Sequence, residues 1–189
     1  MTDLEQADRL RYPIGRFERL TAPLSAAARR AHIDTLDQMP ARLRSLVAGL
    51  SDPQLETLYR PGGWTIRQVV HHVPDSHMNA YVRMKLAITE DAPAIKVYEE
   101  QLWAELPDAK SGPIDMSLAL LDALHRRWVA FLRSQPETAF ARTYTHPEWG
   151  QVTIDEALAM YAWHCRHHTA HVEQAIRNTS LETRGQPIA

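Results

Sequence analysis

The sequence predicts an all-α protein built as a four-helix bundle with one long crossover connection. Glycine is scarce, with 7 in 189 residues, and apolar side chains recur three or four positions apart over long stretches. Two of these stretches begin with the pattern Thr-x-x-Gln or Thr-x-x-Glu, the capping box of a helix N-terminus. A chain of this length, 44% hydrophobic, is expected to form one domain with a substantial core.

The first two helices carry clear local signals. One is expected within residues 24–50, where Pro40 should kink or break it because proline lacks the backbone N–H. The next begins at "WTIRQVVHH", where Thr65 and Gln68 form the first capping box. Pro74 lies inside this second helix and should bend it.

The third and fourth helices follow in the second half of the chain. The third is expected at residues 115–135, with Asp115 as its N-cap. The fourth begins at "TIDEALAMYAWH", where Thr153 and Glu156 form the second capping box. One apolar stripe runs along the third helix: Leu118, Leu121, Leu124, Trp128 and Leu132.

Two connections between the helices and two terminal segments complete the predicted domain. Residues 91–114 form a long connection with three prolines, and such a loop often carries a short helix or covers a site. Residues 142–153, "RTYTHPEWGQVT", place β-prone flanks around Pro-Glu-Trp-Gly and predict a small β-hairpin. The metal-binding bundle is expected at 15–177, between a flexible N-terminal extension (1–14) and a flexible tail (178–189).

Composition excludes several classes of partner. The net charge is −2 and the basic residues are scattered, so no nucleic-acid partner is expected. No apolar run is long enough for a signal peptide or a membrane span, so no membrane partner is expected. The single cysteine, Cys165, fits a reducing compartment. We therefore expect a cytoplasmic protein that acts on a small molecule.

Four histidines within eight positions mark the last helix, in "YAWHCRHHTAHVEQ". Residues four apart share a helix face, so either His164 with His168 or His167 with His171 could offer two imidazoles to one metal. The apolar stripe contains His168 and borders His164, whereas the other pair turns toward solvent. An interior metal site would use His164 and His168. Spacing alone supports a metal site and an incidental histidine face about equally.

A third ligand is expected from the second helix. His72 follows an apolar pair and lies nearer the buried face than His71. Three histidines would leave open coordination positions, as catalytic zinc sites do. Asp75 and Asn79 follow at i+3 and i+7 and are expected in the same substrate pocket, with Asp75 as the best candidate for a partner base. Packing or surface roles are expected for the remaining polar candidates: His32, His71, His77, His125, His146 and, as a small core residue, Cys165.

The segments "GGWTIRQVVHHVPDSHMNAYVRMKLAITED" and "YAWHCRHHTAHVEQ" together resemble the DinB superfamily of four-helix-bundle metalloproteins, specifically its YfiT-like group. The resemblance extends to "YPIGRF", "SLALLDALHRRW" and "THPEWG", so it spans nearly the whole globular chain. Laid onto this chain, the family's three ligands fall on His72, His164 and His168. The resemblance implies one divalent metal per chain, zinc or else nickel, and a cytoplasmic protein that is often a homodimer.

The resemblance also implies the chemistry. The first expectation is a metal-dependent hydrolase, in which the three-His metal activates a bound water. An alternative is a thiol S-transferase that activates a low-molecular-weight thiol, such as bacillithiol or mycothiol, at the same metal. A second alternative is of a different class and does not follow from the resemblance: a metal-binding stress protein without turnover, whose closed zinc site would need a fourth ligand such as His77 or Glu173.

Overall fold

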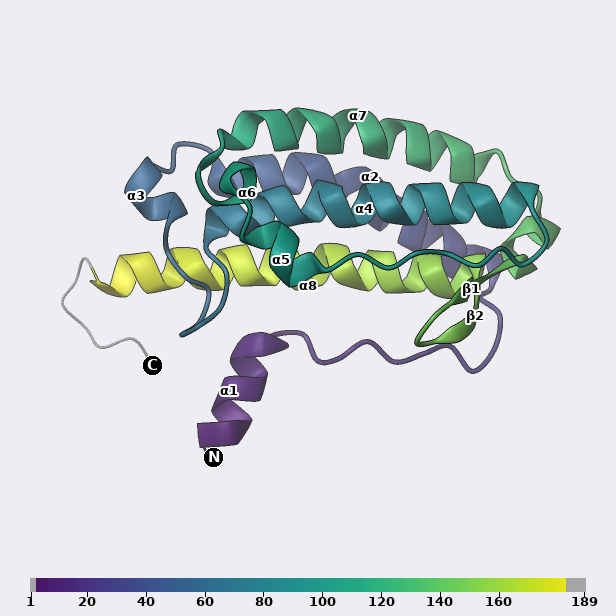
Figure 1. Ribbon diagram of the computed structural model, residues 1–189, viewed down its shortest axis with the longest axis horizontal. Helices are drawn as coiled ribbons and strands as arrows, with labels where there is room; N and C mark the ends of the chain where they lie inside the picture. Colours follow the sequence, from purple (N-terminus) through teal and green to yellow (C-terminus); the bar gives the residue numbers. More distant parts are fainter. Residues whose placement is uncertain (1–2, 183–189) are drawn as a thin grey trace.

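The computed structural model describes residues 3–182 and contains a four-helix bundle, which confirms the predicted class (Figure 1). In the bundle, α2 and α4 each contact both α7 and α8, so α2 lies diagonally opposite α4, and α7 opposite α8. The four bundle helices are α2 (Ala26–Val47), α4 (Ile66–Thr89), α7 (Ile114–Arg133) and α8 (Ile154–Glu182).

Two prolines lie inside bundle helices without ending them. Helix α2 runs through Pro40 and α4 through Pro74, so the break considered at Pro40 does not occur. Both prolines are buried, and tertiary packing of a helix outweighs the loss of one backbone hydrogen bond. The missing N–H of Pro40 also leaves the Leu36 carbonyl without its usual helical donor. That carbonyl binds a histidine described below.

The structure confirms some of the predicted helix N-caps and not others. The capping box at Thr65 is complete: Gln68 N–H donates to Thr65 Oγ1 (3.1 Å) and Thr65 N–H to Gln68 Oε1 (3.0 Å). Only half of the second box forms, because Glu156 binds Arg19 instead of the backbone N–H of Thr153. The prediction of Asp115 as a cap is wrong, since α7 begins at Ile114 and places this residue in the first turn.

Replacing Thr65 by alanine is expected to lower the free energy of unfolding by about 1 kcal/mol, because the N-terminus of α4 loses its side-chain cap. Urea unfolding monitored by circular dichroism measures this. The matched control is Thr35→Ala. The Thr35 hydroxyl donates back to the Ala31 carbonyl within α2, so its loss should leave the free energy of unfolding within about 0.5 kcal/mol. Equal losses in both variants would contradict the capping role.

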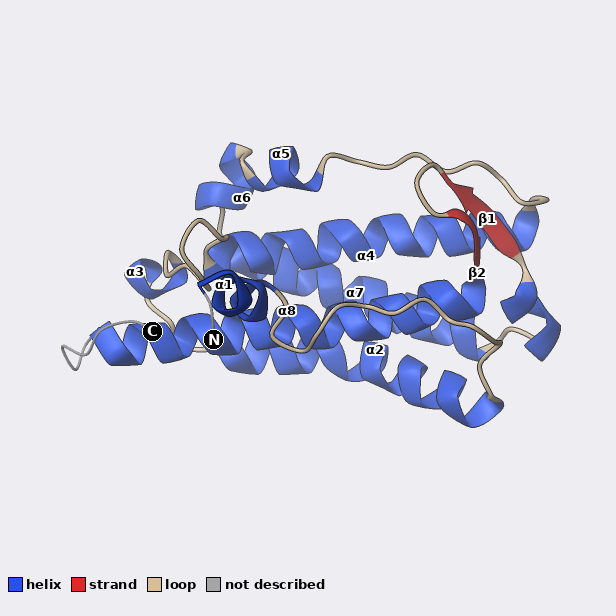
Figure 2. Cartoon of the chain, turned by 90° about the horizontal axis from the view of Figure 1, so that it is seen from below, coloured by secondary structure: helices blue, strands red, loops and turns tan. Residues whose placement is uncertain are grey.

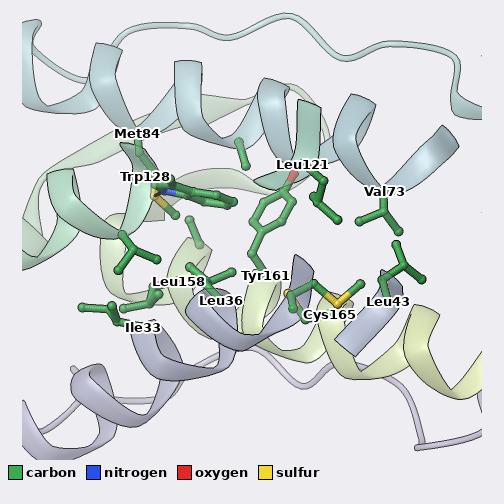
Figure 3. Packing of buried hydrophobic residues seen from close by; sticks show 14 of the residues in the cluster. Ile33, Leu36, Leu43, Val73, Met84, Leu121, Trp128, Leu158, Tyr161 and Cys165 are labelled. Atoms are coloured by element: carbon green, nitrogen blue, oxygen red, sulfur yellow. Dashed lines mark hydrogen bonds between the residues drawn. The ribbon is translucent and has the colours of Figure 1, made fainter. Parts of the chain in front are cut away.

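The core lies between the four helices. Trp128 and Tyr161 pack edge to face, with ring centroids 5.6 Å apart, among aliphatic side chains (Figure 3). Trp128 is fully buried, and its indole N–H donates to Met84 Sδ at 3.2 Å. Cys165 is 2% exposed within the same cluster, which confirms it as a core residue. Four of the five residues of the expected α7 stripe are buried: Leu118, Leu121, Trp128 and Leu132.

The long crossover runs back along α4 and joins it to α7 (Figures 1 and 2). As expected, it carries short helices of its own, α5 (Glu100–Ala104) and α6 (Pro107–Ser111). The predicted hairpin is present: β1 (Thr143–His146) pairs antiparallel with β2 (Gly150–Thr153). Gly150 has φ +70°, a left-handed conformation that glycine adopts without strain. Two further short elements are α3 (Asp52–Leu55) and the 3₁₀ helix η1 (Glu137–Ala141).

The two ends differ from the extensions that we expected. Residues 3–11 form helix α1 (Asp3–Arg11), and the segment after it runs alongside α8 (Figures 1 and 2). At the other end α8 continues to Glu182, beyond the expected boundary at 177, while residues 183–189 lie outside the described residues. Within the described residues, no helix combines the length and the apolarity needed to cross a membrane.

Candidate metal centre

Three imidazoles converge between α4 and α8. His72 Nε2 lies 3.4 Å from His164 Nε2, and His168 Nε2 lies 3.1 Å from the same atom. One ligand atom from each residue falls within 4.8 Å of the others. His72 and His168 are each 5% exposed, and His164 is partly buried. The structure thus brings together the three residues that the sequence singled out.

This donor set fits a divalent metal ion. Burial lowers the pKa of His72 to about 3 and lowers those of His164 and His168 well below the ordinary value, so all three rings are neutral near pH 7. Neutral imidazole is the form that binds metals. In a tetrahedral zinc site with Zn–N bonds of about 2.0–2.1 Å, two ligand nitrogens lie about 3.3–3.4 Å apart. The observed separations from His164 are close to this distance.

A chain of buried hydrogen bonds extends from His164 to the far side of the bundle. His164 Nδ1 lies 2.9 Å from His77 Nε2, and His77 Nδ1 lies 2.7 Å from His125 Nε2. His125 Nδ1 in turn lies 2.6 Å from the Leu36 carbonyl oxygen. This is the carbonyl that Pro40 leaves without a helical donor.

The chain fixes the tautomer of each ring. A carbonyl only accepts hydrogen bonds, so His125 must carry its proton on Nδ1. Its Nε2 then accepts from His77 Nδ1–H, and His77 Nε2 accepts from His164 Nδ1–H. Burial lowers the pKa of His125 to about 4 and that of His77 well below its ordinary value, so neither ring is doubly protonated. His164 therefore presents the Nε2 lone pair to the metal position. We call His77 and His125 the histidine relay.

A shorter chain acts in the same way on His168. His171 Nε2 lies 3.0 Å from the Arg11 carbonyl oxygen, which places its proton on Nε2. Its Nδ1 is then free to accept from His168 Nδ1–H, at 3.4 Å. Two backbone carbonyls thus set the tautomers of His164 and His168, the two α8 histidines of the cluster. Such outer partners commonly orient metal-bound histidines.

The prediction that His167 and His171 face solvent is wrong. They are 7% and 2% exposed. The ring of Tyr59 stacks on His171 with centroids 3.9 Å apart, and the rings of Tyr12 and Trp163 stack on His167. The covering residues Tyr12 and Tyr59 lie more than 100 positions earlier in the chain, so a helical wheel of α8 alone cannot show them.

The two residues considered as a fourth ligand do not join the cluster. His77 directs Nε2 toward the Nδ1 atom of His164, on the side opposite the metal position. Glu173 forms an ion pair with Arg42. Among the described residues the cluster therefore contains three donors, which argues against a closed zinc shell. His71 has a structural role, as expected, because it binds Ser117 Oγ (2.7 Å) and the Gly112 carbonyl (3.1 Å).

A cavity of about 770 Å³ opens onto the three histidines. From α4 it is lined by His72, Ser76 and Arg83. Asp75 and Asn79 are not among its lining residues in the described part of the chain, so their expected place in the pocket is corrected.

The contacts of Asp75 and Asn79 explain why both residues lie outside the cavity. The Asn79 amide donates to the Asp75 carbonyl at 2.9 Å, so it is occupied within α4. Burial, and then the charge of Asp108 in α6, raises the pKa of Asp75 to about 6. Asp75 is therefore close to the crossover helices. Sequence spacing did not show which side of α4 the crossover covers.

Fold and site together define a four-helix-bundle protein with a cluster of three histidines that fits a metal ion at the wall of a cavity. A family model described as the DinB superfamily matches residues 35–172, most of the chain. The chain belongs to the DinB superfamily, as its motifs indicated.

Close relatives carry consistent names. A Bacillus cereus (strain B4264) protein named "Putative metal-dependent hydrolase" is 50% identical over 163 residues, which cover 86% of this chain and 93% of that protein. A Bacillus mycoides (strain KBAB4) protein of the same description is 49% identical over the same length and the same shares of both chains. The solved structure of YfiT from Bacillus subtilis, described as "a probable metal-dependent hydrolase with an unusual four-helix bundle topology", matches with a TM-score of 0.88 at 44% identity. That match covers 91% of this chain and 98% of the other.

Proposed function

We propose that this protein is a zinc-dependent hydrolase of small molecules, with His72, His164 and His168 as the ligands. The observation that carries the proposal is the convergence of three neutral Nε2 atoms at the wall of a cavity of about 770 Å³. The names of the relatives from Bacillus cereus and Bacillus subtilis support the same class. Zinc is proposed because three imidazoles with a remaining open position are typical of catalytic zinc.

The chain's own residues have separable roles in this proposal. Three neutral ligands leave a zinc ion its full charge, which lowers the pKa of a coordinated water toward about 7. Outer histidines hold the ligand rings in the binding tautomer. Trp64 lies against the His72 ring, with centroids 4.6 Å apart, and forms part of the cavity wall beside the metal position. Aromatic lining of this kind excludes water and holds the apolar part of a substrate.

The test is hydrolysis by the full chain, purified without chelators or nickel resin and loaded with zinc. A panel of carboxylic esters, amides and lactones is assayed with and without added low-molecular-weight thiols. We expect turnover without thiol, loss of turnover with a chelator, and recovery when zinc is returned. Turnover only in the presence of a thiol would favour the S-transferase instead. Tight zinc binding without turnover on any substrate would favour a non-catalytic metal protein.

A further inference from the structure

The cavity contains a buried positive charge without a carboxylate partner. Arg83 in α4 is 8% exposed and lines the cavity. Its Nη2 donates to the Lys96 carbonyl at 3.0 Å, and the Tyr161 hydroxyl also lies against its guanidinium. Among the described residues no aspartate or glutamate forms an ion pair with it. A buried charge is costly unless a group of opposite charge offsets it.

Arg67, in the same helix, shows how this fold treats a buried arginine that has a structural role. It is 6% exposed and binds Asp52 at 2.8 Å, Glu56 at 2.6 Å and the Gly112 carbonyl at 3.0 Å. Arg67 thus has two carboxylates, whereas Arg83 has none. The comparison indicates that the counter-charge of Arg83 comes from outside the chain.

The other groups near Arg83 do not supply that charge. Glu99, Glu100 and Glu148 line the same cavity, but among the described residues none of them forms an ion pair with Arg83. Burial raises the pKa values of Tyr144 and Tyr161, so both hydroxyls stay protonated. Burial, and then the charge of Arg83, lowers the pKa of His146, so this ring is neutral near pH 7. These groups can donate or accept hydrogen bonds around an anion, but they cannot replace it.

A second observation points to a polar occupant of the same cavity. Two buried side-chain atoms, Arg60 Nε and His167 Nδ1, have no hydrogen-bond partner among the described residues, and the Tyr98 hydroxyl lies beside Ser76. Arg60 and His167 both line this cavity, as does Tyr98. Buried polar atoms are nearly always satisfied in folded proteins. Their common location indicates that the cavity accepts a ligand with polar groups as well as an apolar body.

We propose that the substrate carries a carboxylate, which Arg83 binds while the bond to be hydrolysed lies at the three-histidine site. His72 and Arg83 are eleven residues apart on α4, close to three full turns, so they share a face about 16 Å apart along the helix axis. The cavity touches both ends of this face and Ser76 between them. The inference rests on the proposed hydrolase function and names its substrate class.

A carboxylate fits better than a phosphate group. Four other arginines line the cavity, but Arg11, Arg16 and Arg19 are exposed and Arg60 is half-buried, so among the described lining residues Arg83 is the buried cation. Its single positive charge matches a carboxylate and leaves a phosphate dianion half compensated. The cavity wall also contains Glu99, Glu100 and Glu148, whose charges oppose a dianion more strongly than a monoanion. The planar guanidinium can also bind both oxygens of a carboxylate.

The test uses two series of metal-binding probes on the zinc-loaded full chain. Alkane hydroxamates bind zinc through the hydroxamate, and in one series the other end is a carboxylate, in the other a carboxamide of equal size. Chain length varies from short to long, and isothermal titration calorimetry gives the dissociation constants. At the best length, wild type should bind the carboxylate at least about tenfold more tightly than the carboxamide.

Variants of Arg83 distinguish the loss of its charge from a general disturbance of the fold. Arg83→Gln should abolish the carboxylate preference without changing carboxamide binding or zinc content, and Arg83→Lys should keep part of the preference. The matched control is Arg16→Gln: Arg16 also lines the cavity, but its side chain is 62% exposed and pairs with Asp8, so its loss should leave the preference intact.

The outcomes also distinguish the two proposals. Equal binding of both series by wild type, or a preference that survives in Arg83→Gln, would overturn the anion site and leave the metal site standing. If neither series binds the zinc-loaded protein, the metal is not open to ligands. In that case the proposed hydrolase function fails, and the substrate class fails with it.

Discussion

The His168→Ala variant is expected to lose zinc, with an affinity about a thousandfold below that of wild type. His168 would supply one of three bonds to the metal, and structural zinc sites with four ligands bind with about 10–16 kcal/mol, or about 2.5–4 kcal/mol per ligand. A loss of about 4 kcal/mol corresponds to a thousandfold. Elemental analysis gives the metal content, and competition with a chromophoric chelator gives the affinity. His72→Ala and His164→Ala should behave in the same way.

The matched control is His71→Ala. His71 directly precedes His72 and is also buried, but its ring binds Ser117 and the Gly112 carbonyl instead of the cluster. This variant should retain the zinc affinity of wild type even if its stability falls. His171→Ala should show a smaller loss, about tenfold, because His171 acts through His168. Zinc retained in His168→Ala and lost in His171→Ala would refute the ligand set.

Much of the architecture could be predicted from local patterns in the sequence. The capping box at Thr65 and the apolar stripe of α7 depend on neighbouring residues, and both appear in the structure. The second capping box formed only in part because Glu156 is held by Arg19, which lies 137 positions away. A distant partner of this kind leaves no trace in local spacing. The same reason explains why the covering of His167 and His171 was missed.

The residues of the candidate site could likewise be predicted from local spacing only in part. The i, i+4 pair of His164 and His168 was visible in the sequence because both residues lie on one helix. The histidine relay was not, since His77 and His125 come from different helices and each alone resembles an ordinary packing residue. One indirect signal was present: Pro40 inside a helical pattern must leave the carbonyl four residues earlier without its helical donor. The sequence does not show which side chain binds that carbonyl.

The relay itself leads to the second large effect. Replacing His125 by phenylalanine is expected to weaken zinc binding about ten- to a hundredfold, although His125 does not touch the metal position. Without Nε2 of His125, the His77 Nδ1–H has no acceptor, and His77 gains by moving its proton to Nε2. That proton would face His164 Nδ1–H, so His164 would be driven to the tautomer with its proton on Nε2. A protonated Nε2 cannot bind zinc.

Two readouts test this account of His125. Chelator competition gives the zinc affinity, and ¹⁵N NMR of the metal-free protein reports which nitrogen of His77 and His164 carries the proton. His125→Gln should restore much of the affinity, because its amide oxygen can accept from His77 while its NH₂ donates to the Leu36 carbonyl.

Trp128→Phe is the packing control, since its ring contacts both relay histidines but forms no part of the hydrogen-bond chain. If Trp128→Phe weakens zinc binding as much as His125→Phe, packing rather than tautomer control explains the effect. If the tautomer of His164 is unchanged in His125→Phe, the relay does not set it. An intact affinity in Trp128→Phe, together with rescue by His125→Gln, would show that a backbone carbonyl of α2 controls the tautomer of a metal ligand on α8. A proline within a bundle helix would then contribute to zinc affinity from the opposite side of the core.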